Sequence, residues 1–331
     1  MNNMGAGMAI TGCGSAVPEA VLTNDHLAQM VDTSDEWIAT RTGMKNRHIA
    51  SPRESLSQLS ASAAKSAIAM AGIAPAEIDL IILATSTPDD MFGSACKIQG
   101  LIEASNAVAF DLTAACSGFL FALITASQFI RTGVYKNILI IGADVLSRWV
   151  DWTDRTSCIL FGDGAGAAVC QRVDDDRLLS FGMYSNGSQN DSLNLNYCGD
   201  RKSLTKDITA QYGTFNPITM NGKEVYRFAV AKVPEAISKA MFQANLIADD
   251  IDWLLLHQAN QRIMDAVAKR LKIPQSKILS NIEKYGNTSA ASIPLALDAA
   301  VRDGRVKPGD IIAASGFGAG LTWGSAIFKW G

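Results

Sequence analysis

The sequence contains no long hydrophobic run, although 48% of its 331 residues are hydrophobic. None of its apolar stretches approaches the roughly 18 consecutive apolar residues that a membrane-spanning helix needs. The segment from Met1 to Gly5 also lacks the basic start and apolar core of a secretory signal. We therefore expect a cytoplasmic protein that does not act in a membrane.

Charge of one sign is not in large excess either. The chain has 29 basic and 32 acidic residues, which gives a net charge of −3. Proteins that bind nucleic acids or acidic membrane surfaces usually carry a clear positive excess. We expect no nucleic-acid partner, whereas a local basic patch that faces an acidic protein stays compatible with this balance.

Metal, redox and nucleotide-binding motifs are absent from the sequence. The six cysteines form no CxxC pair, and none of the three histidines stands at zinc-finger spacing, so we expect no metal site. The glycine-rich residues 315–320 follow neither GxGxxG nor a phosphate-loop pattern and predict a tight turn between strands. Scattered cysteines are usually small buried residues, so a reactive one needs a separate argument.

An internal repeat is present instead. Residues 71–84 align with residues 244–257 without a gap, and residues 113–123 align with residues 287–297. A third, looser pair begins at Arg131 and Arg302. Both segments of the first pair have the pattern of a helix end, an acidic turn and a buried parallel strand, and both segments of the second pair are a small-residue turn that opens an apolar helix. The constant order and nearly constant spacing indicate a duplicated α/β unit.

The repeat predicts two halves, residues 1–172 and 173–331, with the charged run 174–177 at their junction. A domain usually has about 150 residues, which agrees with this division. Alternating strands and helices favour mainly parallel sheets with helices outside. Residues 183–219 are polar and weakly periodic, and we expect a long excursion there, often a binding element, before a helix near Asn221.

Cys116 is the first candidate for chemistry. It follows the apolar strand 107–112 and precedes an apolar helix over 117–130, where α/β folds bind ligands. The helix dipole there favours a thiolate, and the backbone N–H can hold an oxyanion. Small neighbours leave room for an acyl group. The alternative is a cysteine that only fills a tight junction between strand and helix.

His257 and Asn287 stand at comparable positions. His257 ends the strand 253–256 and begins a helix, and Asn287 follows a turn and begins the next helix. A helix N-terminus would lower the pKa of His257 and keep it neutral, able to donate a hydrogen bond. A buried histidine with structural partners is the alternative. His26 is expected at the surface or in a helix cap, and His48 at a loop or strand edge.

With these residues in view, the chain resembles the thiolase-like condensing enzymes, and most closely the β-ketoacyl-acyl carrier protein synthase III family. The matching stretches are long, unusual and spread over the chain: residues 32–38, 40–43, 115–119, 161–166, 257–260, 285–292 and 316–324. The resemblance implies a thiolase-like, internally duplicated fold of five layers, α/β/α/β/α.

The resemblance also implies a reaction, the initiating condensation of type II fatty acid synthesis. Cys116 would take an acetyl group from acetyl-CoA, and malonyl-acyl carrier protein would then lose CO2 and attack the thioester to give acetoacetyl-acyl carrier protein. His257 and Asn287 would stabilise the enolate, and the N–H groups of Cys116 and Gly318 would form the oxyanion hole. No cofactor is implied beyond acetyl-CoA as a substrate.

Further residues match the family's binding sites. Trp37 and Arg155 correspond to a clamp on the adenine of coenzyme A, and Tyr226 and Asn260 to the pantetheine tunnel. The docking face for an acidic carrier protein corresponds to Gln258, Ala259, Asn260, Gln261, Arg262, Arg227 and Lys269. The family implies a homodimer, in which Met91 would stand where relatives often place a phenylalanine at the floor of the acyl pocket.

Other condensing enzymes match less well. Elongating synthases use a cysteine and two histidines, but His257 is the only histidine after Cys116. Thiolases need a second cysteine near the C-terminus, but the last one here is Cys198. Plant-type polyketide synthases share Cys-His-Asn but not the other motifs.

Three alternatives stay open: a secondary-metabolism relative with another acyl starter, a thioester hydrolase with a Cys116–His257 pair, and a silent acyl-binding subunit.

Overall fold

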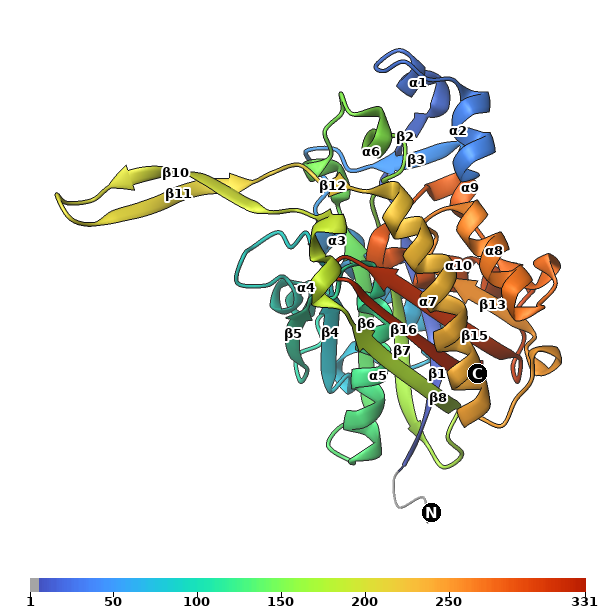
Figure 1. Cartoon of the computed structure of the whole chain (residues 1–331). Coiled ribbons are helices and arrows are strands. Elements are labelled where there is room, and N and C mark those ends of the chain that lie inside the picture. Colours follow the sequence, from blue (N-terminus) through green and yellow to red (C-terminus); the bar gives the residue numbers. More distant parts are fainter. Residues whose placement is uncertain (1–5) are drawn as a thin grey trace.

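The computed structural model describes residues 6–331, and Figure 1 shows their arrangement. The expectation of no secretory signal rests on the first five residues, which lie outside this part. No helix in the described part is long and apolar enough to cross a membrane.

Two five-stranded sheets form the frame of the molecule (Figure 1). The first has the order β1 (Gly7–Ala16), β7 (Gly164–Val173), β6 (Asn137–Asp144), β4 (Leu80–Ala84) and β5 (Val108–Leu112). The second has the order β8 (Leu178–Ser185), β16 (Thr322–Lys329), β15 (Ile311–Gly318), β13 (Trp253–Leu256) and β14 (Ile278–Leu279). In each sheet the first two pairings are antiparallel and the last two parallel. The two sheets therefore have the same topology, as the repeat predicts.

The sheets are mixed, so the expectation of mainly parallel sheets was wrong. Strands β15 and β16 are joined by residues 319–321 alone, and only antiparallel neighbours allow so short a connection. The glycine-rich residues 315–320 form the end of β15 and the first part of this turn, so the stretch leads from one strand into the next. The strands of the first sheet end at Val173 and those of the second begin at Leu178, with the charged run between them.

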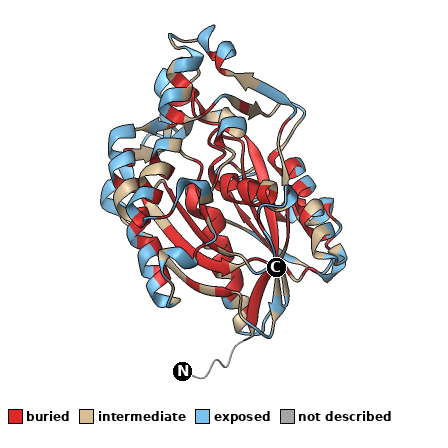
Figure 2. Cartoon of the chain, turned by 90° about the vertical axis from the view of Figure 1, so that its right-hand side faces the viewer, coloured by how far each residue is buried: buried red, intermediate tan, exposed pale blue. Residues whose placement is uncertain are grey.

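Helices complete the five predicted layers. The long helices are α3 (Leu56–Ala71), α5 (Gly118–Arg131), α7 (Gly222–Gln243), α8 (Gln261–Leu271) and α10 (Ser292–Arg302). Helices α5 and α10 pack between the sheets and contact both of them. Helix α3 covers the outer face of the first sheet, and α7 and α8 cover the second. Figure 2 shows the resulting buried centre and exposed outer faces.

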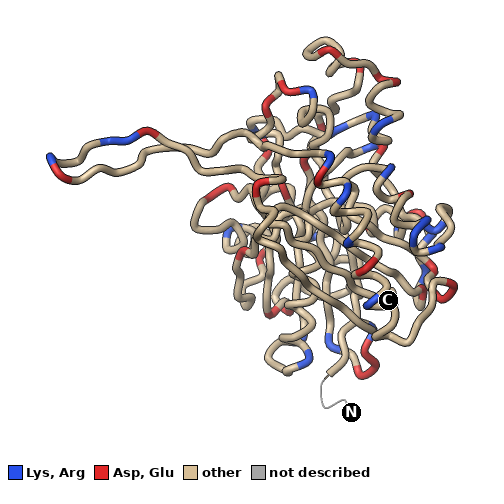
Figure 3. Tube along the Cα trace, in the orientation of Figure 1, with Lys and Arg blue, Asp and Glu red and all other residues tan. Residues whose placement is uncertain are grey.

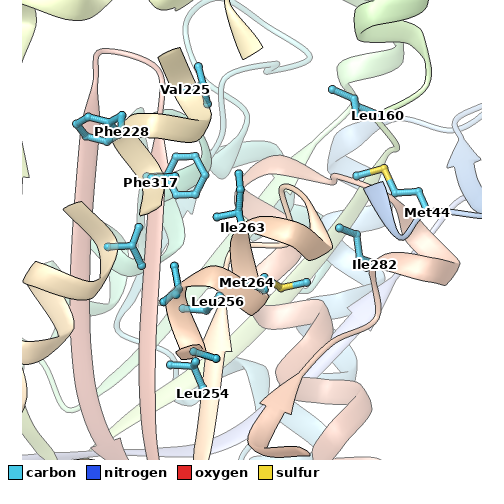
Figure 4. Close-up of a cluster of buried hydrophobic side chains, with 14 of the residues drawn as sticks. Met44, Leu160, Val225, Phe228, Leu254, Leu256, Ile263, Met264, Ile282 and Phe317 are labelled. Carbon is cyan, nitrogen blue, oxygen red and sulfur yellow. The ribbon is translucent and has the colours of Figure 1, made fainter. Parts of the chain in front are cut away.

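The core beside the second sheet is built from side chains of several layers (Figure 4). Leu254 and Leu256 of β13 lie beside Ile263 and Met264 of α8, and Phe317 of β15 lies near the same cluster. Helix α8 is amphipathic, so its apolar face packs on the sheet and its charged face is left exposed. This packing fixes the end of β13, which carries His257.

The remaining elements are short. The helices are α1 (Asn24–Ala28), α2 (Asp35–Thr42), α4 (Ala95–Leu101), α6 (Arg155–Cys158) and α9 (Ile282–Tyr285). The strands are β2 (Ala20–Thr23), β3 (Asn46–Ile49), β9 (Leu193–Asn194), β10 (Tyr197–Ser203), β11 (Thr209–Phe215) and β12 (Thr219–Met220). His26 takes part in the cap of α1 and His48 lies in β3, as expected.

The expected excursion begins later than predicted, because β8 extends to Ser185. It contains the hairpin of β10 and β11, which projects away from the body in Figure 1. The aromatic ring of Phe215 contacts the rings of both Tyr197 and Trp149 at the base of this hairpin. The excursion ends at α7, whose N-cap is Asn221, as expected.

Candidate active site

Cys116 lies at the carboxyl ends of the parallel strands of the first sheet, in a short 3-10 turn, η2 (Ala115–Ser117), before α5. Ala115 has a φ of 47°, in the left-handed region that side chains rarely adopt. This turn directs the chain from β5 into the central helix. Cys116 is only 9% exposed.

The surroundings of Cys116 disfavour the thiolate, which the helix terminus was expected to favour. The pKa of this thiol is raised to about 12, mainly by burial and to a smaller extent by the nearby Asp144. The hydroxyl of Ser289 acts in the opposite direction, because it donates a hydrogen bond to Sγ at 3.3 Å. Removal from water outweighs the helix terminus, which the sequence could not show.

The backbone N–H of Cys116 finds no acceptor on any other residue that the structure describes. Gly318, the last residue of β15, lies directly over it: a Cβ built there would come within 2.6 Å of the Cys116 nitrogen. A side chain at position 318 would therefore cover this amide. The absence of one leaves the N–H able to bind an oxygen from the cavity.

The equivalent position in the second half is Ala290, in the turn η7 (Ser289–Ala291) before α10. Here the strand that ends over the amide is β6, and its last residue is Asp144. The Asp144 carboxylate accepts a hydrogen bond from the Ala290 N–H at 3.2 Å. Asp144 is fully buried, and burial raises its pKa. Sequence reasoning missed Asp144, which ends β6 as Gly318 ends the equivalent strand β15.

His257 directly follows β13, but α8 begins only at Gln261, so it is not at a helix N-terminus as expected. The imidazole is buried, and this burial lowers its pKa to about 3. The expected neutral ring is therefore found, for a different reason. Its Nδ1 lies 2.7 Å from Oγ of Ser292, and its ring packs edge-on against Phe317.

Asn287 lies five residues before α10, not at its first turn as expected. Its backbone pairs with the segment around Phe161, which fixes its position. Its Oδ1 accepts a hydrogen bond from the Ser289 N–H at 2.9 Å, so Nδ2 is left to donate. Asn287 and His257 thus offer two neutral donors. Sequence reasoning missed Ser289, which contacts both Cys116 and Asn287.

A cavity of about 520 Å³ brings these residues together. Cys116, His257 and Asn287 all line it, as do Trp37, Tyr226 and Asn260. Leu193 and Met220 from the excursion also line it, in keeping with the binding role expected of that segment. Every charged residue of the lining is basic, namely Arg41, Lys223, Arg227 and Arg262. The cavity can therefore hold an apolar acyl chain near Cys116 and anionic groups at its mouth.

Trp37 and Arg155 lie together, as expected. The Arg155 guanidinium lies 4.8 Å from the centre of the Trp37 ring, and Arg41 lies 4.4 Å from it. A third aromatic ring between two such planes needs a separation of about 7 Å. A flat ring that stacked between Trp37 and Arg155 would therefore require these two side chains to move apart.

The residues expected to dock a carrier protein divide into three kinds. Gln258 is fully buried, and its amide donates to backbone carbonyls of Leu256 and Leu279. It therefore cannot contact a carrier protein, and its expected docking role was wrong. Gln261 is half-buried and donates to Asp265. The others lie at the cavity or on the exposed face: Ala259, Asn260, Arg262, Arg227 and Lys269. Figure 3 shows the basic residues along α7 and α8.

Met91 lies away from the cavity lining, in the exposed loop before α4, and is 79% exposed. Its neighbour Phe92 is fully exposed and was not predicted from the sequence. This loop lies beside β5, the edge strand of the first sheet, where Val108 and Phe110 are also exposed. The edge strand and the loop form one apolar surface.

The comparisons with known proteins agree along the whole chain. Residues 110–187 match the family "3-oxoacyl-[acyl-carrier-protein (ACP)] synthase III", and residues 241–330 match its C-terminal family. The β-ketoacyl-[acyl-carrier-protein] synthase III of Acaryochloris marina is 66% identical over 100% of this chain and 99% of its own length. The same enzyme of Microcystis aeruginosa is 65% identical over 100% of both chains.

Solved structures give the same result. The 3-oxoacyl-[acyl-carrier-protein] synthase III of Aquifex aeolicus superposes with a TM-score of 0.90 and 44% identity, over 98% of this chain and 100% of that one. The priming β-ketosynthase of the R1128 polyketide pathway superposes with a TM-score of 0.90 and 34% identity, over 98% and 97% of the two chains.

Proposed function

The chain belongs to the β-ketoacyl-[acyl-carrier-protein] synthase III family, the condensing acyltransferases that initiate fatty acid synthesis. From this membership and the geometry of the site, we propose that Cys116 carries the acyl group and that His257 and Asn287 activate the second substrate. The observation that carries this proposal is the shared cavity, where a buried thiol, a free backbone N–H and two neutral donors meet.

The first step transfers an acetyl group from acetyl-CoA to Cys116. The thiol attacks the thioester carbon, and the N–H groups of Cys116 and Gly318 bind the developing oxyanion. The C–S bond to coenzyme A then breaks, and the departing sulfur takes up the proton that the Cys116 thiol gives up. Ser289 donates to Sγ at 3.3 Å and stabilises the charge on sulfur during this exchange. No metal or redox cofactor takes part.

The second step uses malonyl-acyl carrier protein. Loss of CO2 leaves an enolate on the malonyl thioester, and its oxygen accepts hydrogen bonds from His257 and Asn287. The enolate carbon attacks the acetyl group, and Cys116 leaves as a thiolate that takes a proton from water. A neutral imidazole suits this step, and burial holds the pKa of His257 at about 3.

The substrates reach the cavity through its basic mouth. Arg41, Lys223 and Arg262 would face the phosphates of coenzyme A, while Trp37 and Arg155 would clamp the adenine after separating. The exposed basic residues Arg227 and Lys269 would meet the acidic carrier protein. Since Cys116 must stay a free thiol, a reducing, cytoplasmic location suits the enzyme.

A homodimer would cover the apolar surface of β5 and its neighbouring loop. Unpaired edge strands are usually paired or shielded in stable proteins, and Val108 and Phe110 are exposed here. A two-fold axis beside β5 would bring Met91 and Phe92 onto the partner. Their side chains would then limit the length of the acyl starter in the partner's cavity, with acetyl as the preferred one.

Mass spectrometry of the intact protein tests the proposal. Incubation with acetyl-CoA should add one acetyl group, which Cys116→Ala abolishes and Cys96→Ala, at an exposed cysteine, leaves unchanged. Malonyl-acyl carrier protein should then discharge it with release of CO2. Loading by longer acyl-CoAs alone would favour the secondary-metabolism starter, discharge by water alone would favour a hydrolase, and no loading by any donor would refute the nucleophile.

A further inference from the structure

Ser292 is the first residue of α10, fully enclosed at 1% exposure, and has no place in the chemistry described so far. Its Oγ lies 2.7 Å from Nδ1 of His257 and accepts a hydrogen bond from the Gln258 N–H at 3.4 Å. No other acceptor for the Ser292 hydroxyl proton lies within hydrogen-bond distance among the described residues.

These contacts decide where the proton of the imidazole lies. If Nδ1 carried it, Oγ would accept two hydrogen bonds and the buried hydroxyl proton would have no partner, which is costly. If the hydroxyl donates to Nδ1, every group is satisfied and Nε2 carries the proton. Of the two ring nitrogens, only Nδ1 has a protein partner in the described structure, so Nε2 is the one available to the cavity.

The other half of the molecule supports this reading. By the internal repeat, His257 corresponds to Ala84 and Ser292 to Gly118. A Cβ on Gly118 would meet the Cβ of Ala84 at 3.0 Å, so the two pairs touch in the same way. The hydroxyl is present in the half that has an imidazole to orient and absent in the half that does not.

We infer that Ser292 is a positioning residue, which holds His257 in the tautomer with the proton on Nε2, aimed at the oxygen of the malonyl thioester. This inference rests on the proposed role of His257. It predicts that Ser292 affects condensation and leaves the loading of Cys116 intact, because loading does not use the imidazole.

The test combines spectroscopy with the two half-reactions. The chain has three histidines, so long-range ¹H–¹⁵N spectra of histidine-labelled protein are simple, and His257→Ala identifies the signal of residue 257. The wild type should show the tautomer protonated on Nε2. Ser292→Ala should show a loss of this preference, loading within about twofold of the wild type, and condensation slower by about tenfold or more.

Two further variants separate position from packing. Ser292→Thr keeps the hydroxyl and should restore most of the condensation rate. Ser127→Ala removes another buried hydroxyl of a central helix, which donates to the carbonyl of Ile124 and accepts from the side chain of Gln128. It lies away from the imidazole and should change neither the tautomer nor the rate.

The outcomes are distinguishable. If His257→Ala abolishes condensation while Ser292→Ala keeps both the tautomer and the rate, the inference about Ser292 is overturned and the proposed function stands. If His257→Ala itself condenses at the wild-type rate, the proposed role of His257 fails, and with it the inference.

Discussion

The two halves of the molecule place the same turn before a central helix, but they treat its backbone amide in opposite ways. In the first half the Cys116 N–H lies under Gly318, which has no side chain. In the second half the Ala290 N–H is bound by the carboxylate of Asp144. The amide position therefore binds a carboxyl oxygen of the protein in the second half, and in the proposed mechanism it binds the substrate oxygen in the first.

The difference also explains how the functions divide. The half with the open amide carries Cys116, the proposed nucleophile, whereas the half with the closed amide carries His257 and Asn287, the proposed enolate donors. Both halves strain the residue before the amide, since Ala115 and Ser289 have φ values of 47° and 51°. Duplication thus supplied one scaffold, and in the proposed mechanism a few side chains at equivalent positions make one copy react and the other assist.

Closing the open amide should have the largest effect. Gly318→Asp would copy Asp144 onto the first half and place a carboxylate at the Cys116 N–H, so acetyl loading should fall below detection. Gly318→Ala should slow loading by about 100- to 1,000-fold, because its Cβ crowds the amide that binds the oxyanion. Loading measured by intact mass checks both, and loading within threefold of the wild type would contradict the comparison.

Weakening the closed amide should act mainly on stability. Asp144→Asn replaces one carboxyl oxygen with an NH2 group, which donates hydrogen bonds and cannot accept them. The oxygens of Asp144 accept from Thr85, Ser86, Thr87 and Ala290, so the change should lower the free energy of unfolding by about 2 kcal/mol. Urea denaturation measures this loss.

Asp163→Asn is the matched control for that change, since Asp163 is equally buried and accepts from Ala50 and Ser147. Both variants should lose stability, but only Asp144→Asn should also slow loading, through Ser289 and Ala290. Unchanged stability in Asp144→Asn would show that the carboxylate does not hold the second turn.

Removing the hydroxyl of Ser289, which joins the second half to Cys116 of the first, should have a smaller effect on loading. Ser289→Ala deletes the hydrogen bond to Sγ of Cys116, worth about 1 kcal/mol, and should slow loading about fivefold. The equivalent residue of the first half is already an alanine, so the backbone turn should persist. Rapid-quench measurement of loading tests this, and an unchanged rate would remove Ser289 from the first step.

The smallest effect concerns pH. The pKa of His257 is about 3 in the folded protein, against an ordinary value of 6.5. Between these values the unfolded chain binds a proton that the folded one does not, so stability falls as the pH falls through this range. Condensation should show no loss from imidazole protonation near pH 6.5. A decline of the condensation rate with that midpoint, absent in loading, would contradict the buried neutral ring.

Much of this organisation could be predicted from the sequence. The repeat gave the equivalence of β4 with β13 and of α5 with α10, because apolar patterns and small-residue turns are local signals. Cys116, His257 and Asn287 could be named because each follows a predicted strand or turn, and all three line one cavity.

What could not be predicted depends on contacts between distant segments. The pKa of Cys116 is raised because several layers bury the thiol together, and no local pattern reports that burial. In the sequence, Asp144 has the pattern of a polar residue at the end of a strand, and only the structure shows that it accepts a hydrogen bond from η7. Gln258 likewise has the pattern of a surface residue, and only the structure shows that it donates to β14. Phe92 directly follows Met91, which was predicted, and only the structure shows that Phe92 is the more exposed of the two.

The most direct test of the division between the halves measures the two half-reactions separately in His257→Ala and Asn287→Ala. Acetyl loading should proceed at nearly the wild-type rate in both, and the acetyl-enzyme should then persist when malonyl-acyl carrier protein is added. If either variant fails to load, or loads and then condenses normally, the assignment of the nucleophile to one half and the enolate donors to the other is wrong.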